Sequence, residues 1–265
     1  MELLLKENFS EVLHLSEPEE ILHLTFDRRS SGSVSIFMDG PVKKLLLYIE
    51  GKPDCNAKVF LQNKADEEAE IELKADVDKD AFVAFGLLDL EQTKLKTKLH
   101  GYLHDKGASL DIYTGQLCLA NADKNNEVKI VHDMGYTNGN IHNFAVCFDE
   151  GKYFMAADGT IKKGCSQSQS HQQTRVLTMG QKHKAEVIPI LYIDEDDVKA
   201  SHALTIGQPD EAQLYYLQSR GLTKEQAMGL LAIGYFMPVI DLVDDEELHE
   251  KLRFEMEEKA GLYER

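Results

Sequence analysis

The chain of 265 residues lacks several features that would assign its class at once. It has no apolar run of 18 residues, which argues against a membrane-spanning helix. The opening residues MELLLK have too short an apolar stretch and no basic start for a secretory signal, so we expect a cytoplasmic protein. Basic residues are in deficit, because 29 Lys and Arg stand against 46 Asp and Glu, and the net charge is −17. That charge argues against a nucleic-acid backbone or an anionic membrane as partner.

Cysteine is scarce and scattered. The four cysteines are Cys55, Cys118, Cys147 and Cys165. No C-x-x-C pair is available to hold zinc or a permanent iron–sulfur cluster, and free thiols are favoured over a disulfide framework in a chain without a secretory signal. We therefore expect no tightly bound cofactor.

Familiar catalytic signatures are also missing. Residues 159–164 have the glycine spacing of a phosphate-binding loop, but Cys-Ser follows where Lys-Ser or Lys-Thr is needed. His100 and His104 lie four apart, but glycine replaces the glutamate of a zinc-protease helix, which favours solvated strand or turn histidines. The acidic run at 194–197 lacks calcium-loop spacing, and such runs usually face water.

What the first half does contain is a series of short segments rich in β-branched and aromatic residues. These predicted strands cover residues 34–37, 44–49, 58–61, 70–73, 81–85, 109–113, 128–131 and 143–147. Residues 90–106 alternate polar and apolar positions and are also interpreted as strand, although a helical pattern fits them too. Most strands have no helical crossover between them, so the pattern favours either a β-sandwich or a β-solenoid and does not choose.

The last sixty residues change to helical patterns. Pro209 suits the first position of a helix that we predict from about Gln208 to Arg220, with Gly221 in a left-handed C-terminal position. This helix has an apolar side formed by Leu214, Tyr215 and Leu217.

Two further helices are predicted after it. Thr223 and Gln226 form a capping box, and we expect Pro238 to end this second helix. Its predicted buried stripe consists of Ala227, Leu230 and Leu231. A third helix follows Asp244 or Asp245 and ends near Gly261. Its apolar residues, spaced by four, are Leu248, Leu252 and Met256.

Residues from about 157 to 240 resemble the SufB/SufD family, the scaffold subunits of the SUF iron–sulfur cluster assembly machine. DDVKASHALT is similar to the SufD-type signature D-D-V-x-C-S-H-G-A-T, and DEAQLYYLQSRG is similar to D-E-E-x-L-F-Y-L-x-S-R-G. Ala200 stands where the signature has cysteine, and Ala203-Leu204 replaces Gly-Ala. The cysteine of SufB-type members falls at or near Thr174, so the chain resembles a short form of SufD, with most of the N-terminal helical extension missing.

The resemblance implies a mainly β fold: a right-handed parallel β-helix with a C-terminal helical subdomain. We accordingly divide the chain into an N-terminal segment at 1–30, a β-helix core at 31–206 and the helical subdomain at 207–265.

The resemblance also implies a function. The chain is expected to be a non-enzymatic scaffold that dimerises through the β-helix, with itself or with a SufB-type subunit, while ATP is hydrolysed on the ATPase SufC. A transient iron–sulfur cluster would be its cargo. His202 is the first ligand candidate because the family's equivalent histidine lies near the scaffold–scaffold interface, and Cys165 and Cys147 come next. For each cysteine, a small buried side chain in the solenoid is the simpler alternative.

The terminal helices have two possible roles that can coexist: covering the last rung of the solenoid and docking SufC. The side chains expected to matter for either role are Leu214, Tyr215, Leu230, Tyr235 and Phe236. Two other functions remain open at this point, a carbohydrate-active β-solenoid enzyme and a structural SufC-binding paralogue that never touches a cluster.

Overall fold

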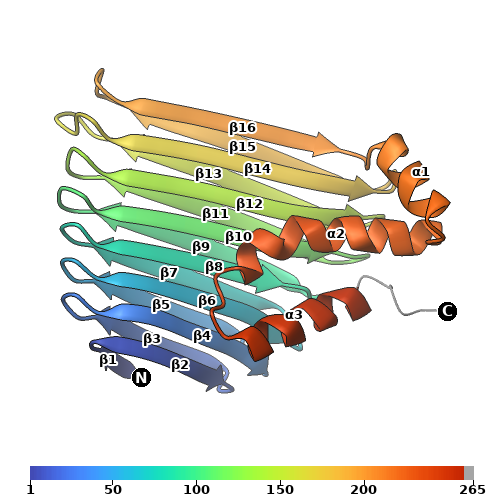
Figure 1. The fold of residues 1–265 in the computed structure, drawn as a ribbon, viewed down its shortest axis with the longest axis horizontal. Helices are drawn as coiled ribbons and strands as arrows, with labels where there is room; N and C mark the ends of the chain where they lie inside the picture. Colours follow the sequence, from blue (N-terminus) through green and yellow to red (C-terminus); the bar gives the residue numbers. More distant parts are fainter. Residues whose placement is uncertain (260–265) are drawn as a thin grey trace.

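The computed structural model describes residues 1–259, which form a parallel β-solenoid of about seven turns followed by three helices (Figure 1). Strands alternate between two sheets of eight strands each, with the odd-numbered strands in one, sheet A, and the even-numbered strands in the other, sheet B. Neighbouring strands pair in parallel throughout. The predicted parallel β-solenoid is confirmed, and the sandwich alternative is wrong.

Sheet A contains β1 (Glu2–Leu5), β3 (Glu19–Phe26), β5 (Lys44–Gly51), β7 (Ala69–Val77), β9 (Lys94–Leu103), β11 (Asp123–His132), β13 (Lys152–Ile161) and β15 (Lys184–Ile193). Sheet B contains β2 (Asn8–Leu15), β4 (Ser31–Gly40), β6 (Asn56–Ala65), β8 (Phe82–Asp89), β10 (Ser109–Cys118), β12 (Asn138–Phe148), β14 (Gln169–Met179) and β16 (Lys199–Gly207). The helices are α1 (Glu211–Ser219), α2 (Lys224–Ile240) and α3 (Glu246–Lys259). Each predicted strand overlaps one of these elements, although β8 begins one residue after the predicted start at Ala81, and β9 confirms a strand within residues 90–106.

Residues 1–30 contain β1, β2 and β3, which continue the two sheets in register with the strands that follow. The interior between the sheets is one continuous cluster of buried side chains that runs from Leu5 to Val176. Successive side chains of a strand point to opposite faces, so every second residue enters this cluster.

The turns from sheet A to sheet B share one backbone feature. Each of six successive turns contains a residue with left-handed φ, and its N–H donates to a carbonyl in the turn of the next rung. These residues are Arg29, Asp54, Asp80, Gly107, Tyr136 and Gln167. Paired positions move apart along the chain, from Asn8 and Ser31 to Lys152 and Lys184. The structural repeat therefore has neither a fixed length nor a fixed residue, which explains why the sequence shows no strict repeat.

The first helix begins later than predicted. Asp210 is its N-cap and accepts hydrogen bonds from the backbone N–H groups of Ala212 and Gln213, so Pro209 lies outside the helix. The helix ends as predicted, with Gly221 at φ +98°.

The second helix has the predicted capping box but does not end at Pro238. It continues to Ile240, because proline this close to the C-terminus removes only one hydrogen bond and Val239 and Ile240 are buried. Its predicted stripe is partly wrong, since Leu230 is 43% exposed, whereas Ala227 is buried. The side chains that do face the sheet are Ala232, Ile233, Phe236, Val239 and Ile240.

The third helix buries Leu252 and Met256, as predicted, and Leu248 packs partly buried against the same cluster. Gly261, its predicted end, lies outside the described residues.

Helices α2 and α3 lie across the outer face of sheet B, where they form a second apolar core (Figure 1). The sheet side of this core consists of Phe37, Phe60, Leu88, Leu90, Leu117, Phe144, Val146, Leu177 and Met179. Gly86 and Gly115 let α2 and the residues just after it approach closely, because a Cβ at Gly86 would lie 2.5 Å from Leu242 and one at Gly115 would lie 3.0 Å from Val239. The expectation that the helices cover the last rung is therefore wrong, and they cover a side of the solenoid instead.

Among the helices of residues 1–259, none has both the length and the apolar character needed to cross a bilayer.

Candidate functional site

The last rung of the solenoid, β15 and β16, is open at its outer edge, and we call this surface the open end (Figure 1). Each of the two strands has a hydrogen-bonded neighbour on one side only. Large apolar side chains are exposed along both strands: Ile188 at 42%, Tyr192 at 62%, Ile193 at 38%, Leu204 at 41% and Ile206 at 42%. An apolar sheet edge of this kind is a typical site for association with another chain.

His202 lies in the middle of this open end. It pairs in register with Gln172 of β14, whose side chain is buried in the solenoid interior, so His202 occupies an inner-face position that no further rung covers. Ser201 points to the outer face, where its Oγ lies 2.7 Å from Nδ1 of His171. Ser201 and His202 therefore face opposite sides of sheet B and do not form a catalytic pair.

The structure does not bring the two cysteine candidates to His202. Cys147 is fully buried and lies beside Cys118 on the neighbouring strand. It is six residues along β12 from Ile141, the position in line with Gln172 and His202, or about 20 Å away along the strand direction. Neither cysteine candidate is more than 2% exposed.

Cys165 occupies the turn between β13 and β14, where its Sγ donates to the carbonyl of His132 at 3.2 Å. Burial raises the pKa of the Cys165 thiol, which disfavours the thiolate form that binds metal. Within residues 1–259, no three His, Cys, Asp or Glu side chains gather closely enough to hold a metal ion. A metal bound by His202 would therefore need ligands from outside the described residues.

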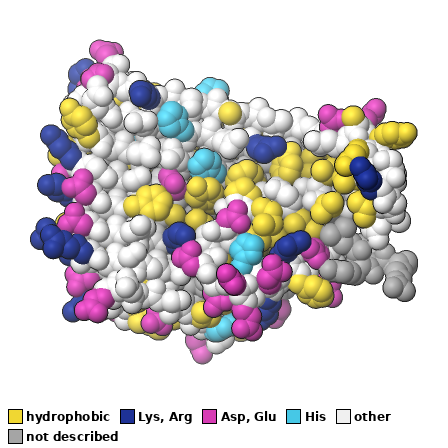
Figure 2. All heavy atoms as spheres, in the orientation of Figure 1, with side chains coloured by type: hydrophobic (Ala, Val, Ile, Leu, Met, Phe, Trp, Pro, Cys, Tyr) yellow, Lys and Arg dark blue, Asp and Glu magenta, His cyan; other side chains and the backbone are white. Residues whose placement is uncertain are grey.

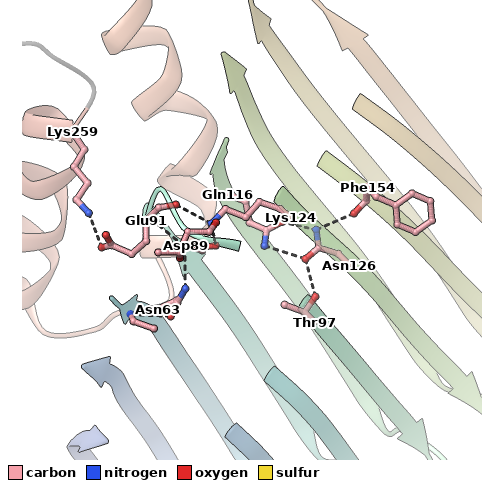
Figure 3. A network of polar contacts seen from close by, with 11 residues as sticks. Asn63, Asp89, Glu91, Thr97, Gln116, Lys124, Asn126, Phe154 and Lys259 are labelled. Carbon is pink, nitrogen blue, oxygen red and sulfur yellow. Dashed lines mark hydrogen bonds and ion pairs between the residues drawn. The ribbon is translucent and has the colours of Figure 1, made fainter. Parts of the chain in front are cut away.

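The interior behind the open end is polar. Thr114 donates to Asn143, and Asn143 donates to Thr174, through Oγ1–Oδ1 and Nδ2–Oγ1 distances of 2.9 and 3.1 Å. Thr174 in turn pairs in register with Leu204 of the open end. Deeper inside, Lys124 forms a fully buried ion pair with Asp89 at 2.7 Å and donates to the carbonyls of two further residues (Figure 3).

The docking candidates on the helices separate into two groups. Tyr215 is 75% exposed on α1, which has no buried residue, and Leu230 is exposed on α2. Phe236, by contrast, is 2% exposed and belongs to the core between α2 and sheet B, so it supports the fold instead of offering a docking surface. Tyr235 lies between these groups, with the guanidinium of Arg175 4.9 Å from its ring centre.

Leu214 is half-buried beside a shallow hollow of about 320 Å³ between the end of β14, α1 and the start of α2. Figure 2 shows a continuous band of apolar side chains along the helices on this face. The exposed part of this band is therefore on α1 and the outer side of α2.

The carboxylates on the outer face of sheet A are mostly paired with cations across neighbouring strands. Lys96 lies 2.9 Å from Glu70, Lys44 lies 3.0 Å from Glu72, and the hydrogen bond from Lys96 lowers the pKa of Glu70. Such a ladder stabilises a sheet face. This ladder pairs each carboxylate with a cation, whereas a glycosidase places two carboxylates opposite each other across its substrate. The carbohydrate-enzyme alternative therefore gains no support from this face.

The open end with its histidine, the polar interior and the helical flank all fall within one recognisable unit. A family profile described as "SUF system FeS cluster assembly, SufBD core domain" matches residues 55–235, which include both strands of the open end. The chain belongs to the SufBD core family. Its β-solenoid and its SufD-like motifs agree with this assignment, which confirms the resemblance found in the sequence.

Individual relatives of this SufBD chain are iron–sulfur cluster assembly proteins. It is 36% identical over 137 residues to SufD of Bacillus subtilis (strain 168), an alignment that covers 52% of this chain and 31% of that protein. It is 25% identical over 121 residues to SufD of Escherichia coli (strain K12), covering 46% and 29%. A SufBD family protein of Mycobacterium tuberculosis (strain H37Rv) is 28% identical over 163 residues, covering 60% and 19%. The chain thus spans less than a third of the length of these relatives.

Sequence reasoning missed three parts of the site. The open end, the buried Lys124–Asp89 pair and the apolar outer face of sheet B all depend on which strand lies beside which. Only the apolar outer face of sheet B had a signal in the local sequence, because strands such as β12 have apolar residues on both faces near their C-terminal ends.

Proposed function

We propose that this chain is a scaffold subunit for iron–sulfur cluster assembly, and that it joins a second scaffold subunit through the open end. The observation that carries the proposal is the uncovered last rung with His202 on its inner face, in a chain of the SufBD core family. A neutral imidazole is a competent iron ligand, and the second subunit would supply the remaining ligands. Iron and sulfide are then the cargo, and the chain itself breaks no bond.

The proposed energy source is a SufC-type ATPase docked on the exposed side of α1 and α2. Large apolar side chains on a surface helix mark an interaction site, and Tyr215 and Leu230 supply them here. ATP would be hydrolysed on this partner.

A physical connection joins the two proposed surfaces. Helix α1 packs on α2, and α2 packs on β8, β10, β12 and β14. Arg175 of β14 lies over Tyr235 of α2, and β14 in turn pairs with β16, which carries His202. Nucleotide-driven movement of the partner would therefore shift the open end through contacts already formed.

Anaerobic reconstitution with ferrous iron and sulfide tests the ligand role of His202. We expect the visible charge-transfer absorbance of the assembled scaffold to be lost or strongly reduced in His202→Ala. His171→Ala is the matched control, because His171 lies on the opposite face of the same sheet one strand away. Equal absorbance in both variants would reject His202 as a ligand and would favour a structural paralogue without cluster contact.

Docking of the ATPase is tested by a pull-down with the cognate SufC-type protein. Tyr215→Asp should abolish retention without loss of folding, since the side chain is 75% exposed. Tyr136→Asp is the control, because Tyr136 is 57% exposed in a turn of the solenoid far from α1. Full retention of the ATPase by folded Tyr215→Asp would contradict this docking surface.

A further inference from the structure

A hollow of about 350 Å³ lies between α3 and the outer face of sheet B at its first rungs. Its floor is formed by β2, β4 and β6, and its wall by α3 and the residues just before it (Figure 1). Sites for small molecules occupy about 300–1,000 Å³, so the hollow has room for one. β2, β4 and β6 lie at the opposite edge of sheet B from β16, which places the hollow far from the open end.

The floor of the hollow contains a hydrogen-bond acceptor without a donor. Gln62 of β6 lies beside Phe37 on the outer face of the sheet and is fully buried. Its Nε2 donates to Oε1 of Glu255 at 3.0 Å, and this bond fixes the amide orientation because a flipped amide would set two oxygens against each other. Oε1 of Gln62 is then left buried with no hydrogen-bond partner among residues 1–259. A ligand that carries an N–H donor would satisfy it.

The lining of the hollow has a net negative charge. Four carboxylates and two lysines contribute, so two negative charges remain when His14 is neutral. These charged residues are Asp39, Lys64, Asp245, Glu247, Lys251 and Glu255. An anionic ligand would be repelled by this lining, whereas a cation would be attracted.

Several of these charges are already engaged within the protein. Glu255 accepts from Lys64 at 2.9 Å as well as from Gln62, and Nδ1 of His14 lies 2.6 Å from Asp39. Glu247 and Lys251 are four residues apart on α3, a spacing that favours an ion pair, yet neither forms one with any residue in the described part of the chain. Glu247 is therefore available to attract a cationic ligand, and Lys251 is the group that would repel it.

The apolar part of the lining is aliphatic where it is free. The Phe37 ring is already contacted, since the His14 ring stacks on it and Nζ of Lys64 lies 5.8 Å from its centre. Val12 of β2 is 51% exposed, and Leu248 of α3 is half-buried. Both line the hollow and offer surface to a hydrocarbon chain.

We infer that the hollow is a binding site for a small aliphatic amine in its protonated form. The ammonium group supplies the donor that Gln62 Oε1 lacks, the surrounding carboxylates stabilise its charge, and the alkyl chain packs on Val12 and Leu248. A divalent metal ion is not the occupant, because no three His, Cys, Asp or Glu side chains within residues 1–259 are placed to hold one. The site is independent of the proposed scaffold role.

NMR titration of the isotope-labelled chain with pentylamine tests the inference. We expect saturable shifts confined to amides of β2, β4, β6 and α3, at about 0.15 M salt to screen distant charges. Pentan-1-ol, which has the same chain without the charge, should bind about fivefold or more weakly, and pentanoate should bind more weakly still. Equal affinity for the amine and the alcohol would mean that the buried oxygen of Gln62 binds water only, and would overturn the inference.

Two neutralised side chains one turn apart on α3 give opposite predictions. Glu247→Gln should weaken pentylamine binding two- to fivefold, whereas Lys251→Gln should strengthen it by a similar factor. Both side chains are exposed, so neither change should disturb the fold, and a gain in affinity cannot come from structural damage. Glu250→Gln is the matched control, because Glu250 is an exposed carboxylate of the same helix that does not line the hollow.

A last comparison separates a cation site from a site for a zwitterion. 6-Aminohexanoate carries the same ammonium group with a carboxylate at the other end of its chain, and it should bind no better than pentylamine. Tighter binding of 6-aminohexanoate, lost in Lys251→Gln, would show that Lys251 recognises a carboxylate and would overturn the assignment to simple amines. Gln62→Met, checked for folding by circular dichroism, should abolish the preference for the amine over the alcohol because the acceptor is gone.

Discussion

The interior of the solenoid changes character along its length. In β3, β4, β5 and β7 every buried inward side chain is apolar, as in Leu22, Ile36, Leu47 and Leu73. From Asn63 at the end of β6 onward the interior contains a buried ion pair and a series of amide and hydroxyl groups. The apolar half is held by burial alone, whereas the polar half is held only if each polar group keeps its partner.

The polar half is the half that ends at the open end. His132 Nε2 and Gln172 Oε1 are buried there, and neither has a hydrogen-bond partner in the described part of the chain. Buried polar groups that lack a protein partner commonly bind ordered water. An apolar base and a polar region behind the open end would suit the proposed scaffold, whose last rung would change contacts when a partner binds.

The largest expected effect comes from breaking the buried ion pair. Lys124→Met leaves the carboxylate of Asp89 buried without its cation, and we expect a loss of about 3–5 kcal/mol in the free energy of unfolding. Urea denaturation measures this loss.

The double variant Lys124→Met, Asp89→Leu distinguishes a lost charge partner from a packing defect. Removing both charges should recover at least about 1 kcal/mol relative to Lys124→Met alone. A double variant less stable than the single one would show that Asp89 acts through the hydrogen bonds that it accepts from the Asn63 side chain and the Glu91 backbone N–H.

A pH effect should be specific to the polar half. Burial lowers the pKa of His132 to about 4, whereas an unfolded histidine titrates near 6.5, so the unfolded state binds the proton first as pH falls. Stability is therefore complete above about pH 6.5 and is lost progressively toward pH 4. Between pH 7 and pH 5 the expected loss is about 2 kcal/mol.

The variant His132→Gln removes the titrating group and should flatten this part of the profile relative to the wild type. Urea midpoints at the two pH values give the comparison. The same slope in both proteins would mean that His132 does not control the acid sensitivity.

Breaking the hydrogen-bonded chain of Thr114, Asn143 and Thr174 should lower the free energy of unfolding by a smaller amount. Asn143→Leu removes the bonds to Thr114 and Thr174 at nearly constant volume, and we expect a loss of roughly 1–2 kcal/mol. Because Thr174 pairs with Leu204, hydrogen exchange of the β16 amides should also accelerate in this variant. Unchanged exchange in β16 would separate the interior chain from the open end.

The sequence was sufficient to predict the features of the structure that depend on neighbouring residues. Alternating β-branched residues predicted the strands, Thr223 and Gln226 predicted the second helix start, and the motif around His202 predicted the family. Each of these signals lies within a few neighbouring residues. The predicted start of α1 was wrong. Pro209 fits the first turn of a helix, but Asp210 is the better N-cap, so the helix begins at Glu211.

The remaining features depend on residues far apart in the chain. Lys124 looks like a surface lysine until β8 and β11 place it opposite Asp89. The helices were expected on the last rung, but the apolar outer face of sheet B, assembled from several strands, offers them more surface. The turn repeat was invisible because it consists of backbone conformation at unlike residues such as Arg29, Gly107 and Tyr136.

The smallest expected effect tests the apolar half. Ile36 is fully buried in β4 between Leu13 and Leu61, so Ile36→Val removes one methylene group from close packing and should cost about 1 kcal/mol. The buried thiol in this part of the interior, Cys55, has its pKa raised by burial to about 11 and stays neutral between pH 5 and pH 7. The loss should therefore be the same at both pH values, and the exchange rates of the β16 amides should not change. A pH-dependent loss, or faster exchange at the distant open end, would show that the two halves unfold as one unit and that their difference in composition has no energetic consequence.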